Sequence, residues 1–174
     1  MGVEEPHVPD LVGRRAIIAS VLSSKADVLM LDEPTSGLDA VARRGVWAAL
    51  RELVRSGKTI LLTTHMMEEA EMISDRLAIV NKGSVVACGR LDEIKGLVKE
   101  RFRVVINGDF KQVSGHMEVA KLGDRSIAYL KTQDEAVDLL KATLEMNLRA
   151  EYSPVTLEDV FVKLVGGFEN HENP

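Results

Sequence analysis

The sequence has little cysteine and no long hydrophobic run. Its single cysteine, Cys88, excludes an internal disulfide and fits a reducing compartment. No apolar run approaches the roughly 20 residues that span a bilayer. We therefore expect a soluble, cytoplasmic chain that reaches a membrane only through a partner.

Basic residues are also in the minority, with 22 Lys and Arg against 27 Asp and Glu, a formal charge of −5. Non-specific binding to nucleic acid needs clustered basic side chains, so we predict no nucleic-acid partner. What the sequence does have is the composition of a folded globular protein, with 45% hydrophobic and 28% charged residues. Its 174 residues suit one ordinary domain or two small ones.

The first half of the chain has an alternating strand and helix pattern. Residues 28–31 form a continuous apolar run, which is typical of a strand buried on both faces of a parallel sheet. A helix is predicted from a cap at Asp39 to about Arg55, followed by a second strand over 59–64 and a helix over 67–73. Apolar spacing predicts an earlier helix over 12–22. This order predicts α/β construction, with function at the carboxyl ends of the strands.

The second half has a different order of elements. Turn-forming residues 81–84 lie between two strand-like runs, 77–80 and 85–88, and predict a β-hairpin. A helix over 91–98 follows, and the predicted elements beyond it are strands over 102–106, 126–130 and 148–152, and helices over 134–146 and 156–165. We therefore divide the chain into a leader or loop (1–12), an α/β part (13–98) and an accessory α+β domain (99–174).

Three side chains with catalytic chemistry follow the two predicted parallel strands. Asp32 and Glu33 end the first strand, and His65 comes just after the second. Because both carboxyl ends open on one edge of the sheet, the three side chains are expected to converge there. One carboxylate could orient a hydrated Mg²⁺ and the other a water that attacks phosphorus. The residues alone leave a second interpretation open, namely surface acids beside a histidine with a structural hydrogen bond.

Four spaced segments together resemble one known family. Residues 28–39, VLMLDEPTSGLD, look like the Walker B motif and D-loop of ATP-binding-cassette (ABC) ATPases, and His65 resembles the switch histidine. Residues 14–19, RRAIIA, resemble the helix behind the signature loop, and 79–94 resemble the hairpin and helix that close the cassette. Residues 153–161, SPVTLEDVF, resemble the appendage of ATPase subunits that serve drug and polyketide exporters. The resemblance implies the C-terminal part of a P-loop NTPase (RecA-like) core with a parallel sheet, followed by a small α+β appendage.

The resemblance also implies roles for individual residues. Asp32 would hold Mg²⁺ through water, Glu33 would position the attacking water, and His65 would contact the γ-phosphate of ATP. Ser36, Gly37 and Asp39 would lie at the interface of two cassettes. The implied cofactors of the complete protein are ATP and Mg²⁺. The implied partners are a second ABC ATPase domain and a transmembrane permease, which would hold the protein at the cytoplasmic face of the membrane.

The sequence departs from the family pattern in its first part. It contains no phosphate-binding GxxxxGK[ST] loop and no glutamine loop, and residues 8–12 stand where a signature close to Leu-Ser-Gly-Gly-Gln is expected. The phosphate loop supplies several charge-assisted hydrogen bonds, each contributing about 1.5–3 kcal/mol. We therefore expect a piece of a longer ATPase that is inactive alone and that self-associates through uncovered sheet surface.

Two other functions are compatible with the sequence. The chain could be a non-catalytic module that associates with another ABC ATPase and regulates it. It could also be an unrelated metal-dependent hydrolase that uses Asp32, Glu33 and His65 directly, although no further histidine or carboxylate lies at ligand spacing.

Overall fold

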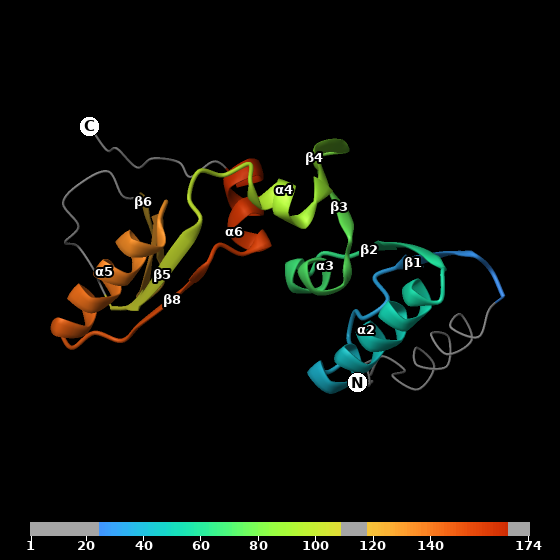
Figure 1. The fold of residues 1–174 in the computed structure, drawn as a ribbon, viewed down its shortest axis with the longest axis horizontal. Helices are drawn as coiled ribbons and strands as arrows, with labels where there is room; N and C mark the ends of the chain where they lie inside the picture. The colour runs from blue at the N-terminus through green and yellow to red at the C-terminus, as the bar shows by residue number, and fades with distance from the viewer. Residues whose placement is uncertain (1–24, 109–117, 167–174) are drawn as a thin grey trace, which may run out of the picture. The chain divides into compact units, whose positions relative to one another are not determined.

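The computed structural model describes residues 25–108 and 118–166 (Figure 1). The chain divides into two compact units, Met1–Ser74 and Asp75–Pro174. Residues 75–98 group in space with the second unit, and the predicted functional boundary between residues 98 and 99 stays a prediction. The predicted leader (1–12), the helix over 12–22 and the segment 14–19 lie outside the described residues.

The first unit contains two strands and two helices. Strands β1 (Val28–Asp32) and β2 (Thr59–Thr63) pair in parallel, with Asp32 opposite Thr63. Helices α2 (Ala40–Arg55) and α3 (Met67–Ile73) follow them in the predicted order. The predicted cap of α2 is confirmed, because the Asp39 carboxylate accepts hydrogen bonds from the first amides of the helix at 2.8 and 2.9 Å.

The parallel sheet is covered on one face by described residues. Leu29 of β1 is buried, as are Trp47 and Leu50 on α2. On the opposite face, Met30 is 77% exposed, and Val28 and Leu61 are exposed as well. The prediction of a strand buried on both faces is therefore wrong for the described structure. The run 28–31 is continuously apolar, but within the described ranges β1 pairs only with β2 and α2 packs against a single face.

The second unit begins with the predicted hairpin of β3 (Arg76–Asn81) and β4 (Ser84–Arg90), followed by the short helix α4 (Leu91–Lys95). A four-stranded antiparallel sheet comes next, in the order β6-β7-β5-β8. Its strands are β5 (Phe102–Asn107), β6 (Glu118–Leu122), β7 (Arg125–Leu130) and β8 (Ala150–Pro154). Helices α5 (Gln133–Glu145) and α6 (Leu157–Phe161) and a π-helical turn, η1 (Val162–Gly166), complete it.

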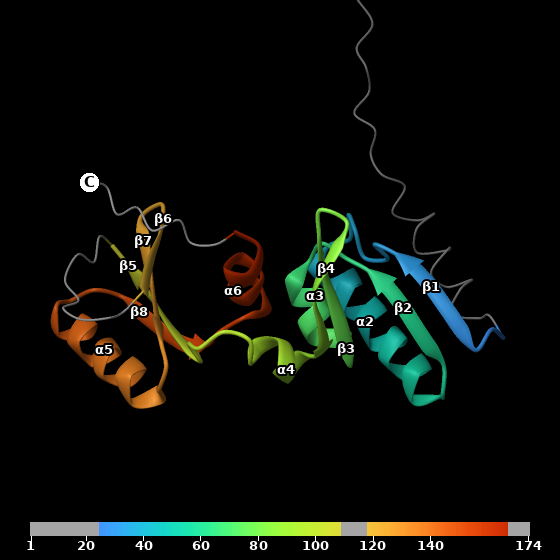
Figure 2. The same cartoon turned by 90° about the horizontal axis from the view of Figure 1, so that it is seen from above.

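Helix α5 packs along the antiparallel sheet and closes its core (Figure 2). The buried centre consists of Val104, Ile106, Ala128, Leu130 and Ala136. Together with the parallel pair of the first unit, this sheet and its helices confirm the predicted fold class, α/β followed by a small α+β unit. Among the described residues, no helix is both long and apolar enough to cross a bilayer.

Candidate active site

The parallel register of β1 and β2 brings two of the predicted residues into contact. Asp32 lies opposite Thr63, so Glu33 and His65 both follow the same edge of the sheet. Nδ1 of His65 lies 2.9 Å from Oε1 of Glu33. The side chains are 67% and 45% exposed, respectively, so both can reach a ligand from solvent. The expected convergence at the carboxyl edge is therefore present in the structure.

Asp32 and Glu33 have different partners, although they are adjacent. The Thr63 hydroxyl donates a hydrogen bond to Oδ1 of Asp32. The Glu33 amide donates to the Thr63 carbonyl at 3.0 Å, with the Thr63 hydroxyl oxygen 3.3 Å away. Thr63 thus holds the Asp32 carboxylate and the backbone of Glu33. The Glu33 carboxylate contacts His65 instead. Thr63 was not predicted as a site residue, although it ends the second predicted strand next to His65.

The backbone turns sharply at the candidate site. Glu33 has a φ of 44°, in the left-handed region that a non-glycine residue adopts at a cost of order 1–3 kcal/mol. Such conformations persist where surrounding contacts hold them, and they cluster at functional sites. Here the hydrogen bonds from the Glu33 amide to Thr63 hold the conformation.

The loop after Glu33 contains the three residues predicted at a cassette interface. The Ser36 amide donates to the Glu33 carbonyl at 3.1 Å, and Gly37 has a φ of 76°, which glycine adopts without strain. Asp39 then caps α2 through its carboxylate. The structure thus gives Asp39 a local role in starting the helix, and the interface role of these three residues stays a prediction.

Three buried residues behind this loop were missed by the sequence analysis. Oε1 of Glu69 on α3 accepts hydrogen bonds from the Thr35 hydroxyl at 2.6 Å and from Nε1 of Trp47 at 2.9 Å. Thr35 and Glu69 are 0% and 1% exposed. The sequence signal was weak, because Glu69 is one of three glutamates within residues 68–71 and only tertiary packing distinguishes it from its neighbours.

The oxygen donors at this edge suit Mg²⁺ rather than a softer metal. Asp32 offers a carboxylate, and Thr63 offers a hydroxyl that is hydrogen-bonded to that carboxylate. Within 25–108 and 118–166, no group of three or more His, Cys, Asp or Glu side chains could hold a metal by itself. That donor set fits Mg²⁺, which is usually bound by one or two carboxylates together with waters and substrate phosphates. The donor set of Asp32 and Thr63 does not favour the alternative of an unrelated hydrolase in which protein side chains alone hold the metal.

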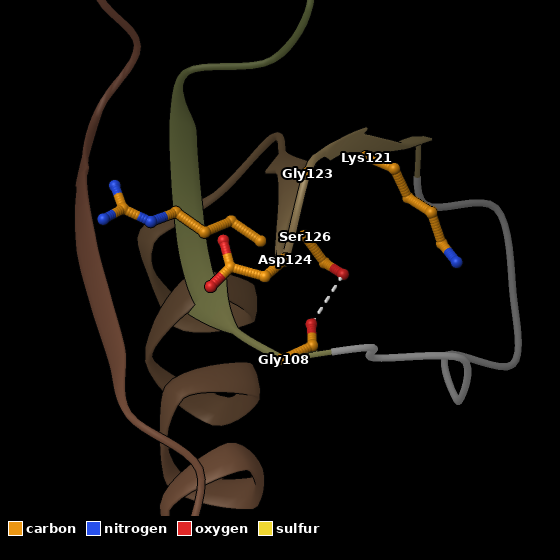
Figure 3. A pocket seen from close by; sticks show the side chains of 6 residues that line it. Gly108, Lys121, Gly123, Asp124 and Ser126 are labelled. Atoms are coloured by element: carbon orange, nitrogen blue, oxygen red, sulfur yellow. Dashed lines mark hydrogen bonds between the residues drawn. The ribbon is translucent and has the colours of Figure 1, made fainter.

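A pocket of about 220 Å³ occurs in the second unit, at the turn between β6 and β7 (Figure 3). Its lining combines three charged side chains with small residues, and the Ser126 hydroxyl donates to the Gly108 carbonyl at 3.1 Å. The lining residues are Gly108, Lys121, Gly123, Asp124, Arg125 and Ser126. None of them was predicted to be functional, so the edge of β1 and β2 remains the candidate site.

No protein-family model matches the chain. The chain is similar to the Nod factor export ATP-binding protein I of Bradyrhizobium diazoefficiens, with 38% identity over 164 residues that cover 88% of this chain and 51% of that protein. The protein of the same name from Rhizobium leguminosarum bv. viciae is 38% identical over 174 residues, which cover 92% of this chain and 54% of that protein. The chain therefore spans about half the length of the curated relatives it matches.

Solved structures with partial similarity include an ATP-binding subunit of an ABC transporter, 35% identical with a TM-score of 0.38, which covers 41% of this chain and 30% of that one. Another is an inward-facing metal-chelate type ABC transporter, 19% identical with a TM-score of 0.43, covering 70% and 47%. The sequence relatives are export ATP-binding proteins, which supports the resemblance to ABC transporter ATPases. The chain is thus similar to about half of a Nod factor export ATP-binding protein.

Proposed function

We propose that the chain is the C-terminal portion of the ATP-hydrolysing subunit of an ABC exporter, carrying its Walker B motif, D-loop and switch histidine. The observation that carries this proposal is the contact between Glu33 and His65, 2.9 Å apart at the carboxyl edge of two parallel strands. Similarity to export ATP-binding proteins over 88% of the chain supports it. The relatives are named for the export of Nod factor. We propose export for this chain but do not propose Nod factor as the exported molecule. The appendage-like segment 153–161 favours an exporter of the drug or polyketide type.

In this function the two exposed side chains act on the γ-phosphate of ATP. The Glu33 carboxylate accepts a hydrogen bond from the attacking water and orients it, and the exposed His65 imidazole donates to a phosphoryl oxygen. The Asp32 carboxylate, oriented by the Thr63 hydroxyl, would hold Mg²⁺ through a water. Bound Mg²⁺ supplies neutralisation of phosphate charge. The chain's own residues thus supply water positioning and phosphate contact, and the phosphate loop comes from elsewhere in the complete protein.

The proposed partners follow from the same function. Ser36, Gly37 and Asp39 face a second ABC ATPase domain, and a transmembrane permease recruits the protein to the cytoplasmic face of the membrane. Without a phosphate loop, the chain alone is expected to hydrolyse no ATP.

A non-catalytic interaction module is the second candidate. It is favoured by the second unit, which has a buried core of its own, centred on Val104, Ile106 and Ala128. A unit with an independent core can dock on another ATPase whether or not the first unit binds nucleotide. The two candidates differ in whether Glu33 is needed for turnover.

Substitution of Glu33 in the complete exporter ATPase tests the proposal. Glu33→Gln should lower kcat for ATP hydrolysis by about 10²-fold or more, since a positioned base contributes 10²–10⁴-fold, and should leave ATP binding intact. Glu68→Gln, an exposed change of the same kind on α3, is the matched control and should hydrolyse ATP at the wild-type rate. Unchanged turnover in the Glu33→Gln protein would favour the interaction module instead.

A further inference from the structure

Glu69 is 1% exposed, which is unusual for an acidic residue on a short helix. A buried carboxylate is costly unless hydrogen bonds compensate it. Glu69 receives two of them at the same oxygen, from the Thr35 hydroxyl at 2.6 Å and from Nε1 of Trp47 at 2.9 Å. Thr35 is itself fully buried, so both bonds are sheltered from water.

The three residues of this buried network come from segments that carry the candidate site. Thr35 lies two residues after Glu33, in the loop that follows β1. Glu69 lies four residues after His65, on the helix that follows β2. Trp47 belongs to α2, so its indole anchors the network to the helix behind the sheet. A single carboxylate oxygen therefore ties the loop of Glu33 to the segment of His65.

The contact between Glu33 and His65 needs such support. Both side chains are largely exposed, and an exposed pair of this kind contributes only about 0–1 kcal/mol by itself. A pair so weak cannot hold two loops at a fixed separation. Buried hydrogen bonds behind the site are the usual means of holding exposed functional groups in place.

We propose that Glu69 is a positioning residue: through Thr35 it sets the separation of Glu33 and His65. The value of this role for catalysis rests on the proposed function, whereas the positioning itself concerns the chain alone. Glu69 touches no reacting group. A merely structural Glu69 would change stability on substitution but would leave the Glu33–His65 contact as it is in every variant that still folds.

The signal that reports the contact is the proton on His65. A hydrogen bond from Nδ1 to the Glu33 carboxylate requires the Nδ1-protonated tautomer, which is detected in ¹⁵N NMR spectra of the labelled chain at about pH 8, where an ordinary imidazole is neutral. The His65 resonances are assigned by comparison with His65→Asn, and Glu33→Ala supplies the spectrum of the broken pair. Trp47 is the only tryptophan, so its indole N–H signal reports the network itself.

Two variants of the network and two controls test the proposal. In Thr35→Val and Glu69→Met, which remove the donor and the acceptor of the network, the His65 Nδ1 signal should move to its position in Glu33→Ala. Thr35→Ser, which keeps the hydroxyl, and Glu68→Met, on the exposed side of α3, should both retain the wild-type signal. Should Glu69→Met fail to fold, Thr35→Val decides, with circular dichroism as the check of folding. A wild-type His65 signal in folded Thr35→Val, or in the folded Glu69→Met protein, overturns the proposal.

This result is independent of the proposed function because no nucleotide is present. If His65 responds to Thr35→Val but the complete Glu33→Gln exporter still hydrolyses ATP, the positioning role stands and the ATPase assignment fails. If Glu33 proves essential for ATP hydrolysis and the His65 Nδ1 signal does not change in Thr35→Val, the ATPase assignment stands and the positioning role fails.

Discussion

Asp159 joins three side chains and one backbone amide of the second unit. Its carboxylate accepts hydrogen bonds from Nη1 of Arg103 at 3.0 and 3.1 Å, from the Tyr129 hydroxyl at 2.9 Å, and from the Thr156 amide and hydroxyl, both at 2.7 Å. Burial by itself raises the pKa of Asp159. The Thr156 hydrogen bonds, the Arg103 charge and the Tyr129 hydroxyl outweigh burial, so the pKa is lowered. The carboxylate therefore stabilises the second unit in its ionised form.

The lowered pKa of Asp159 predicts loss of stability in acid. A carboxyl whose pKa is lower in the folded state contributes stability that is present above its ordinary value of 3.8 and is lost as pH falls through the folded pKa. Tyrosine signals follow unfolding of this unit, since both tyrosines, Tyr129 and Tyr152, lie in it and Trp47 does not. In urea unfolding at neutral pH, Asp159→Asn should be less stable than wild type by about 3 kcal/mol, because it leaves the Arg103 charge poorly paired.

Between about pH 5 and pH 2, the Asp159→Asn protein should lose less stability than wild type. Some pH dependence will persist in the variant, since the pKa of Glu100 and that of Glu135 are lowered too. Glu158→Gln, an exposed neighbour, is the matched control and should be as stable as wild type in urea at neutral pH. Equal acid sensitivity in the Asp159→Asn protein would show that this carboxylate is not the group responsible.

At the residue scale, the site was predicted correctly where the order of strands along the chain determines which side chains lie together. Glu33 and His65 were expected to meet because both follow neighbouring parallel strands, and the 2.9 Å contact agrees with that reasoning. Glu69 and Thr35 were missed because burial of a carboxylate depends on what packs around it. Neither residue type nor spacing shows that Trp47 would supply a second donor.

At the scale of elements, helix and strand periods predicted the described elements within a few residues, except strand β6 (Glu118–Leu122), which was not predicted. The hairpin, the parallel pair and the helices that follow them occur in the predicted order, because their signals are local: apolar period, caps and turn residues. The exposed face of β1 was not predicted. Residues 28–31 are apolar throughout, but the number of layers that cover a strand is a tertiary property that local sequence does not carry.

Two glycines, one inside α2 and one just after its C-terminal end, allow a matched prediction of stability. A Cβ added at Gly45, inside α2, or at Gly57, just after it, would meet no heavy atom within 4 Å. Gly45→Ala should therefore stabilise the first unit by about 0.5–1 kcal/mol, because alanine loses less backbone entropy in a helix. Gly57 has a φ of 96°, so Gly57→Ala should destabilise it by about 1 kcal/mol or more.

Urea unfolding followed by Trp47 fluorescence measures both changes, since the only tryptophan lies on the same helix. The two substitutions add the same methyl group to open space, so opposite signs would isolate backbone conformation as the cause. Destabilisation by Gly45→Ala would mean that α2 is not an ordinary solvent-facing helix at this position.

At the scale of the whole molecule, the two units differ in how completely they enclose apolar side chains. The second unit has a core in which Val104, Ile106 and Ala128 are fully buried between the antiparallel sheet and α5. The first unit leaves Val28, Met30 and Leu61 exposed on one face of its two-stranded sheet. The antiparallel sheet of the second unit therefore has a core enclosed by its own helix, whereas one face of the parallel sheet in the first unit presents apolar side chains to solvent.

That surface predicts self-association of the chain. Complete burial of an aliphatic side chain or a methionine contributes about 1.5–3 kcal/mol, and the three exposed residues occupy one face, where a second copy could cover them together. Within the described ranges β1 pairs only with β2, so an unpaired strand edge adjoins the same face. Because association also costs translational and side-chain entropy, we expect an oligomer that dissociates on dilution rather than an obligate one.

Sedimentation velocity of the purified chain over a range of concentrations tests this expectation. Wild type should sediment as an oligomer at high concentration, and Met30→Lys should shift it to monomer, since the added charge would have to be buried at the interface. Met72→Lys is the matched control: it replaces an equally flexible, exposed methionine on α3 with the same charge, away from the sheet face, and should sediment like wild type. A wild-type monomer at every concentration, or an equal effect of both substitutions, would exclude the face around Met30 as the contact. Loss of association only in Met30→Lys would place the contact on β1, the strand that ends at Asp32.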